Sequence, residues 1–238
     1  MAVLLHGGYW RARYRLDLMN AIADDLCRIG FCVWNLEYRR VGLPGGGWPG
    51  TFNDVAAGFG ILCRLACAYR LDLGRVAVVG HSAGGHLALW LAARVARPPR
   101  LRPALVVGLA PVSDLVAAHL QRLSGDAVAE LLGAAYVDAP ELYRTASPAA
   151  LVPLGIRQLI VHGTADNTVP YAMSIAFHAA ARAGGDACEL LALPDTGHFE
   201  LIDPGTPVWR RISRRIIEIM GSRVTGGVEE PETPTGAA

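Results

Sequence analysis

Short, continuously apolar segments alternate along the chain with segments whose apolar residues recur at helical spacing. The apolar segments predict six strands, at residues 2–5, 31–36, 76–80, 104–109, 158–162 and 188–193. Strands that are covered on both faces of a parallel sheet have this continuously apolar character. Strands that alternate with helices are typical of an α/β domain, so we expect a mostly parallel sheet with helices on both faces.

The segments at helical spacing predict five main helices, at residues 17–29, 52–69, 83–95, 170–183 and 207–220. In residues 52–69 the apolar positions form one clear stripe, and Thr51 is placed to cap the first turn. Gly30 follows the first helix at a suitable position for a C-terminal cap. Pro170 suits the first turn of the helix at 170–183.

Two segments depart from the alternation. Residues 111–155 hold two helical pieces, 115–123 and 127–136, where a single crossover would suffice, and we interpret this segment as an inserted lid over the carboxyl ends of the strands. Residues 221–238 are polar and rich in Gly, Pro, Glu and Thr, which predicts a disordered tail. The expected organisation is therefore one domain over residues 1–220, followed by that tail.

The strongest chemical signal is the segment Gly80-His81-Ser82-Ala83-Gly84. It is a G-x-S-x-G motif between a predicted buried strand and a predicted helix, the context in which the serine occupies a sharp turn with its hydroxyl exposed. The helix that begins at Ala83 directs its positive end at the serine, which favours a developing oxyanion. We interpret Ser82 as a nucleophile; the alternative is a tight turn with an incidental serine.

A serine hydroxyl needs a base, and the base needs a group that orients it. His198 follows the last predicted strand, and Asp166 follows the preceding one, 32 residues earlier in the chain. We predict His198 as the general base and Asp166 as the orienting acid. His162 fits less well than His198, and Asp195 is a rival acid that lies too close to His198 in the chain for an easy return hydrogen bond.

The segment His6-Gly7-Gly8-Tyr9-Trp10 follows the first predicted strand. Two consecutive glycines let backbone amides approach a substrate, so we expect Gly7 and Gly8, together with the amide of Ala83, to form an oxyanion hole. Tyr9 and Trp10 either line an aromatic substrate pocket or pack the loop.

Composition narrows the chemistry further. All 22 basic residues are arginine, so no lysine is present for a Schiff base. The net charge of +1 gives no general attraction to nucleic acid or an anionic membrane. The chain has no HExxH segment, no GxGxxG after a strand and no phosphate loop, so we expect no metal and no organic cofactor. The five cysteines form no CxxC pair, and we expect free core thiols in a reducing cytoplasm.

With these motifs the sequence resembles the α/β-hydrolase superfamily over about residues 1–220, in which nucleophile, acid and base follow in the order Ser82, Asp166, His198. The HGGYW segment is similar to the HGGxW motif of kynurenine formamidases, and HGG-type carboxylesterases carry similar strings. The Glu37-Tyr38-Arg39 stretch resembles the D/E-Y-R stretch of that branch. The resemblance implies acyl transfer to a serine in a small-molecule ester or amide substrate.

The family opens with two antiparallel strands before the HGG strand, and here Met1 stands at the start of that strand. We therefore expect a longer natural chain, and an uncovered sheet edge at residues 31–36. Two other hypotheses stay open: a small serine peptidase of the oligopeptidase type, and a truncated, inactive homologue. We expect a cytoplasmic protein with no membrane span and no nucleic-acid partner. The oligomeric state is left open, a homodimer being one option.

Overall fold

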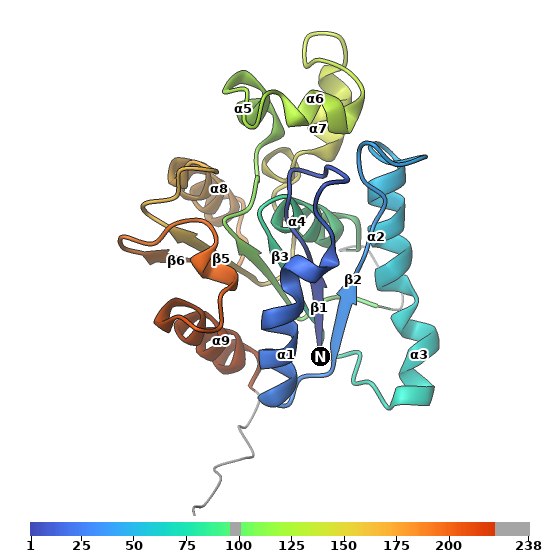
Figure 1. Cartoon of the computed structure of the whole chain (residues 1–238), viewed down its shortest axis with the longest axis vertical. Helices are drawn as coiled ribbons and strands as arrows, with labels where there is room; N and C mark the ends of the chain where they lie inside the picture. Colours follow the sequence, from blue (N-terminus) through green and yellow to red (C-terminus); the bar gives the residue numbers. More distant parts are fainter. Residues whose placement is uncertain (96–100, 222–238) are drawn as a thin grey trace, which may run out of the picture.

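The computed structural model describes residues 1–95 and 101–221, and the predicted tail from residue 222 onward lies outside the described residues. Its centre is a six-stranded sheet in the order β2-β1-β3-β4-β5-β6 (Figure 1). Every pair of neighbouring strands is parallel. The strands are β1 (Ala2–Leu5), β2 (Val33–Leu36), β3 (Ala77–His81), β4 (Leu105–Leu109), β5 (Gln158–Gly163) and β6 (Cys188–Leu193).

Helices cover both faces of this sheet, as the apolar strands predicted. Because successive side chains of a strand point to opposite faces, Val3 and Leu5 join one core cluster, whereas Ala2 and Leu4 join the other. The first cluster includes residues of α2 (Gly50–Gly60), α3 (Leu62–Tyr69), α4 (Ala83–Val95) and α8 (Tyr171–Ala183). The second includes residues of α1 (Asn20–Arg28) and α9 (Pro207–Met220). The sheet is thus the middle layer of three.

The segment between β4 and β5 is more helical than expected. It holds α5 (Leu115–Leu120), α6 (Ala127–Leu132) and α7 (Pro140–Ala146), and Figure 1 shows these helices above the end of the sheet at which the strands finish. The side chain of Asp114 caps α5 by accepting hydrogen bonds from the amides of Val116 and Ala117, at 2.9 and 3.0 Å. The apolar pattern predicted the first two helices but not α7.

Two local expectations are corrected by the structure. Residues 52–69 are not one helix, because α2 ends at Gly60 and α3 begins at Leu62. Thr51 is not the N-cap, since α2 begins one residue earlier. The Thr51 hydroxyl instead accepts a hydrogen bond from the amide of Gly47 and donates one to the carbonyl of Arg39, so it holds the preceding loop against the helix.

The cysteines are free, but the expectation that they belong to the core is wrong for four of them. Cys188 is buried, whereas Cys27, Cys32, Cys63 and Cys67 are exposed. In α3 the buried stripe passes through Leu62 and leaves the following position on the solvent side. None of the described helices is both long enough and apolar enough to span a bilayer.

Candidate active site

The candidate site lies where the strand order reverses. The chain runs from β1 outward to β2 and then returns to β3 on the other side of β1, which makes the space beyond the carboxyl ends of β1 and β3 a topological switch point. Ligands of open α/β sheets bind in such crevices. The HGG segment follows β1 and Ser82 follows β3, so the fold brings these two motifs to the same crevice.

Ser82 occupies a strained turn between β3 and α4. Its φ angle is 55°, in the left-handed region that few non-glycine residues adopt. The turn is possible because glycine stands on both sides of it: a Cβ on Gly80 would clash with the carbonyl oxygen of Gly84, and one on Gly84 would clash with that of Leu5. Such strain persists where surrounding structure imposes it, and it is a feature of functional sites.

The two residues predicted to activate the serine are hydrogen-bonded to each other. His198, after β6, donates from Nδ1 to Oδ2 of Asp166, after β5, over 2.6 Å. The other carboxylate oxygen accepts from the backbone amides of Thr168 and Val169, at 2.8 and 2.9 Å. The carboxylate is therefore fixed by backbone donors on one side and orients the imidazole on the other.

A second histidine, His162, also contacts this carboxylate. Its Nε2 lies 3.2 Å from Oδ2 of Asp166 and 3.0 Å from the carbonyl oxygen of Val169. Since both partners are acceptors, Nε2 carries the proton, and Nδ1 accepts from the Ser174 hydroxyl at 2.7 Å. Sequence reasoning weighed His162 as a rival base and missed this contact, for which the only signal was its position at the end of the strand that precedes Asp166.

The environment of Asp166 keeps it ionised. Burial alone would raise the pKa of this carboxyl, since its side chain is 0% exposed. The hydrogen bonds from His162, His198 and the Val169 amide outweigh burial and hold the pKa well below its usual range. A permanent negative charge beside Nδ1 of His198 stabilises an imidazolium, which is the form a general base acquires when it takes a proton.

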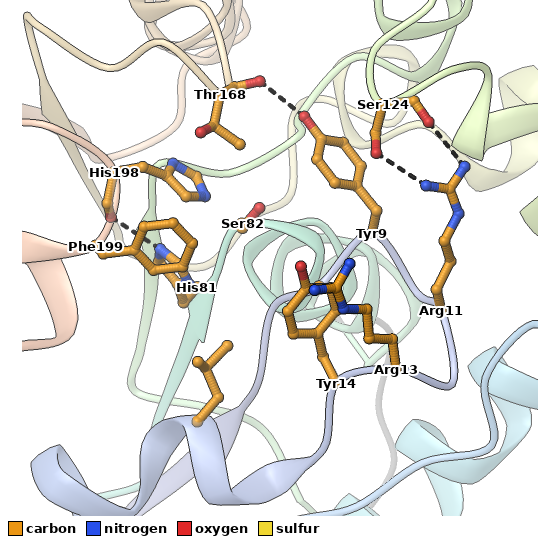
Figure 2. Close-up of a pocket in the computed structure, with 12 residues that line it drawn as sticks. Tyr9, Arg11, Arg13, Tyr14, His81, Ser82, Ser124, Thr168, His198 and Phe199 are labelled. Carbon is orange, nitrogen blue, oxygen red and sulfur yellow. Dashed lines mark hydrogen bonds between the residues drawn. The ribbon is translucent and has the colours of Figure 1, made fainter.

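Ser82 and His198 line one pocket of about 310 Å³. Figure 2 shows Ser82 between His198 and Tyr9 in this pocket. Ser82 is only 2% exposed, and its hydroxyl makes no hydrogen bond to any of the described residues. Hydrogen bonds between catalytic groups are often long before substrate binds and tighten in the substrate complex.

The HGG segment packs directly against Ser82. A Cβ on Gly7 would lie 3.1 Å from Cβ of Ser82 and 2.9 Å from Nδ1 of His81, so only glycine lets the loop come this near. Gly8 has a φ angle of 107°, and a Cβ there would clash with the side chain of Tyr14. Ala83 is the first residue of α4. The three residues predicted to supply oxyanion donors therefore lie next to Ser82 in sequence or in space.

The Glu37-Tyr38 pair explains why the HGG segment holds its position. Oε1 of Glu37 lies 2.9 Å from Nε2 of His6, and the Tyr38 hydroxyl donates to the His6 carbonyl over 2.7 Å. The His6 and Tyr38 rings are stacked, with centroids 4.2 Å apart. Burial lowers the pKa of His6 despite its contact with Glu37. Residues after β2 therefore anchor the loop that follows β1.

Tyr9 and Trp10 separate into two roles. Tyr9 lines the pocket, and its hydroxyl donates to the carbonyl of Thr168 over 2.7 Å (Figure 2). Burial raises the pKa of Tyr9 to about 12, which keeps the phenol protonated as a donor. Trp10 is 0% exposed and packs edge-on against His86, with ring centroids 5.1 Å apart. Of the two interpretations of Trp10, its burial and its contact with His86 favour packing beneath the loop over lining of the pocket.

Acid is expected to destabilise the protein well before the carboxylates titrate. Burial lowers the pKa of His81 to about 3 and that of His86 to about 4, against 6.5 for an unfolded histidine. The unfolded chain therefore binds protons that the folded chain excludes. The free energy of unfolding is therefore at its full value above pH 6.5. It decreases as the pH falls toward 4, by up to about 1.4 kcal/mol per pH unit for each histidine.

Urea unfolding at pH 7, 6 and 5 measures this loss. The His86→Gln variant should show a shallower fall of the unfolding free energy with pH, because one of the buried histidines that cause the fall is gone. An unchanged slope in that variant would contradict the assignment. His86 is a suitable choice because Nε2 donates to the Ala146 carbonyl over 2.9 Å, and a glutamine amide can also donate.

Comparison with known proteins identifies the family. A family model described as BD-FAE matches residues 1–181, and the chain belongs to this family. Esterase LipQ of Mycobacterium tuberculosis is 29% identical over 229 residues, which are 90% of this chain and 53% of that protein. Esterase LipC of the same organism is 27% identical over 217 residues, 84% of this chain and 53% of that protein. The chain thus spans about half the length of the curated relatives it matches.

Solved structures show the same fold. A truncated form of carbohydrate esterase from gut microbiota has a TM-score of 0.77 and 21% identity, covering 93% of this chain and 86% of its own. An acetyl ester-xyloside bifunctional hydrolase from Caldicellulosiruptor lactoaceticus has a TM-score of 0.76 and 24% identity. The match covers 92% of this chain and 82% of that protein's chain. With its parallel six-stranded sheet between helices, the chain has the α/β-hydrolase fold.

Proposed function

We propose that this chain hydrolyses carboxylic esters of small molecules through an acyl-enzyme on Ser82. The observation that carries the proposal is the His198–Asp166 hydrogen bond of 2.6 Å at the wall of the pocket into which the strained Ser82 turn faces. The names of both curated relatives, which are esterases, support ester bonds as the target.

The residues suggest the following steps. Oγ of Ser82 attacks the ester carbonyl while Nε2 of His198 takes the hydroxyl proton, and Asp166 stabilises the imidazolium through Nδ1. In this scheme the amides of Gly7, Gly8 and Ala83 donate to the oxyanion. His198 then gives its proton to the departing alcohol. A water molecule repeats the sequence on the acyl-enzyme, which releases the acid and restores Ser82.

Formamides are the second substrate class to test, because the HGGYW segment resembles that of kynurenine formamidases. The burial of Trp10 removes one aromatic wall on which an aryl formamide could stack, which favours esters. Turnover of p-nitrophenyl acetate and of N-formylkynurenine, each measured against the Ser82→Ala variant, separates the two. We expect kcat/KM to favour the ester. A strong preference for the formamide would reassign the substrate class, and turnover of neither would contradict the proposal.

A further inference from the structure

The pocket in front of Ser82 is lined by positive side chains. Arg11 and Arg13 both contribute to its wall, and no aspartate or glutamate does so among the described residues. The nearest catalytic carboxylate, Asp166, is 0% exposed and already engaged by its hydrogen bonds. Two guanidinium groups on a wall to which no described carboxylate contributes are more than hydrolysis of a neutral ester needs.

Arg11 is neutralised and has a structural role. Its Nε and one terminal nitrogen lie 2.7 and 2.9 Å from the carboxylate oxygens of Glu130, in the bidentate geometry typical of a strong pair. It also donates to the hydroxyl and the carbonyl of Ser124, at 2.9 and 2.7 Å (Figure 2). These contacts fasten the loop after β1 to the segment between α5 and α6, so Arg11 has little capacity left for a ligand.

Arg13 has no such partner. It makes no hydrogen bond or ion pair with any of the described residues. Its guanidinium carbon lies 5.6 Å from the centroid of the Tyr14 ring, a cation–π contact, and Figure 2 shows the two side chains together at the wall of the pocket. The Tyr14 ring packs in turn against Gly8. The unpaired cation is therefore held on a ring that contacts the predicted oxyanion loop.

The rest of the wall fits a flat, apolar body. Tyr9 and Tyr14 contribute rings on one side of Ser82, and Phe199 contributes a third on the side of His198. Phe199 is 55% exposed although it is a large apolar residue, and its ring centroid is 5.3 Å from that of His198. An exposed aromatic side chain beside a candidate catalytic base is a surface on which a planar ligand can stack.

We infer that Arg13 selects esters that carry a carboxylate on a planar, aromatic-sized body, with the carboxylate bound by its guanidinium while the ester carbonyl lies at Ser82. A guanidinium presents paired N–H donors that match a carboxylate, so this group recognises the anion by shape as well as by charge. The inference rests on the proposed ester hydrolysis and adds its substrate class. A free arginine that only faces solvent would show no such selection.

Two matched pairs of substrates test the inference. The first pair, 4-acetoxybenzoate and 4-acetoxybenzamide, has nearly the same shape and places the charge on the alcohol side of the ester. The second, methyl 4-carboxybenzoate and methyl 4-carbamoylbenzoate, places it on the acyl side. We expect kcat/KM at low salt to favour the carboxylate about tenfold in at least one pair, the size typical of a hydrogen bond to a charged group. Sodium chloride should reduce this ratio.

The Arg13→Gln variant is expected to lose the preference for the carboxylate member of each pair. It should still hydrolyse the ester bond of the neutral members, 4-acetoxybenzamide and methyl 4-carbamoylbenzoate. Arg15→Gln is the matched control, because Arg15 is an exposed arginine two residues away that does not line the pocket. Its ratio should equal that of the wild type. A ratio near one in both wild-type pairs, or a ratio that survives in Arg13→Gln, would overturn the inference while leaving ester hydrolysis intact.

Binding separates this inference from the proposed function. Calorimetry with the Ser82→Ala variant measures the binding of each substrate without turnover. In at least one pair the carboxylate should bind more tightly than the neutral member of that pair. The double variant, Ser82→Ala with Arg13→Gln, should bind both members of the pair equally. This readout needs no turnover, so it supports the role of Arg13 even where ester hydrolysis fails. Equal binding of both members of each pair to the Ser82→Ala variant would overturn it.

Discussion

Replacing Ser82 with alanine is expected to lower kcat for p-nitrophenyl acetate by on the order of 10⁶, the loss seen when a nucleophilic serine of a hydrolase is removed. Alanine has no atom that can form the acyl bond. The backbone is expected to tolerate the change, because serine and alanine face similar strain at a φ angle of 55°. Circular dichroism and the midpoint of urea unfolding check that the variant remains folded.

Ser124 offers the matched control for this variant. It is a second serine in the wall of the same pocket, and it also adopts a left-handed conformation, with a φ angle of 52°. Its hydroxyl contacts Arg11 and takes no part in the proposed chemistry. Ser124→Ala should retain kcat within a few-fold. A comparable loss in both variants would show that disturbing the pocket, and not removing the nucleophile, lowers the rate.

Replacing Asp166 with asparagine is expected to lower kcat by about 10⁴, since an amide cannot hold the imidazole in the required tautomer or stabilise its protonated form. The effect should fall on kcat, and KM should change little, because Asp166 lies behind His198 and does not line the pocket. Steady-state kinetics on p-nitrophenyl acetate measure both quantities. A change confined to KM would contradict an orienting role.

Asp195→Asn is the control that decides between the two acids weighed from the sequence. Asp195 is exposed and lies in the loop that carries His198. Its amide donates to the Thr164 hydroxyl, and its carboxylate makes no hydrogen bond with the described residues. We expect wild-type kcat in this variant. If Asp195→Asn, and not Asp166→Asn, abolishes activity, the assignment of the acid is wrong.

Most of the fold followed from the apolar pattern, because strands buried on both faces must be continuously apolar. β1 and β6 have the predicted bounds, and α4 and α9 begin and end where the periodicity does. The division of residues 52–69 was not predictable, since the stripe continues through Gly60 and only packing shows where the first helix ends. α7 was missed, although α5 and α6, which were predicted, are no longer than it is.

The three residues of the proposed triad were found from the sequence, because each follows a different strand of one parallel sheet and the carboxyl ends of such strands meet. Contacts between side chains were not predictable in the same way. The hydrogen bond of His162 to Asp166 depends on how the turn after β5 folds back. The burial of Trp10 depends on the left-handed conformation of the loop, with a φ angle of 57° at that residue.

The unpaired state of Arg13 could not be seen in the sequence either, where it is one of 22 basic residues. Only the structure distinguishes it from Arg11, which is paired with Glu130 of α6. A residue that binds a substrate group is hard to predict for this reason. Its side chain must have no hydrogen-bond or ion-pair partner within the protein, and the sequence does not show this.

Covalent labelling is the most direct test of Ser82 as an activated nucleophile. The wild-type chain is treated with a fluorophosphonate, which reacts with an activated serine, and the modified residue is located by peptide mass spectrometry. We expect one adduct per chain, on Ser82, with no labelling of Ser82→Ala and much slower labelling of Asp166→Asn. A folded wild-type chain that remains unlabelled, or an adduct on another serine, would contradict it.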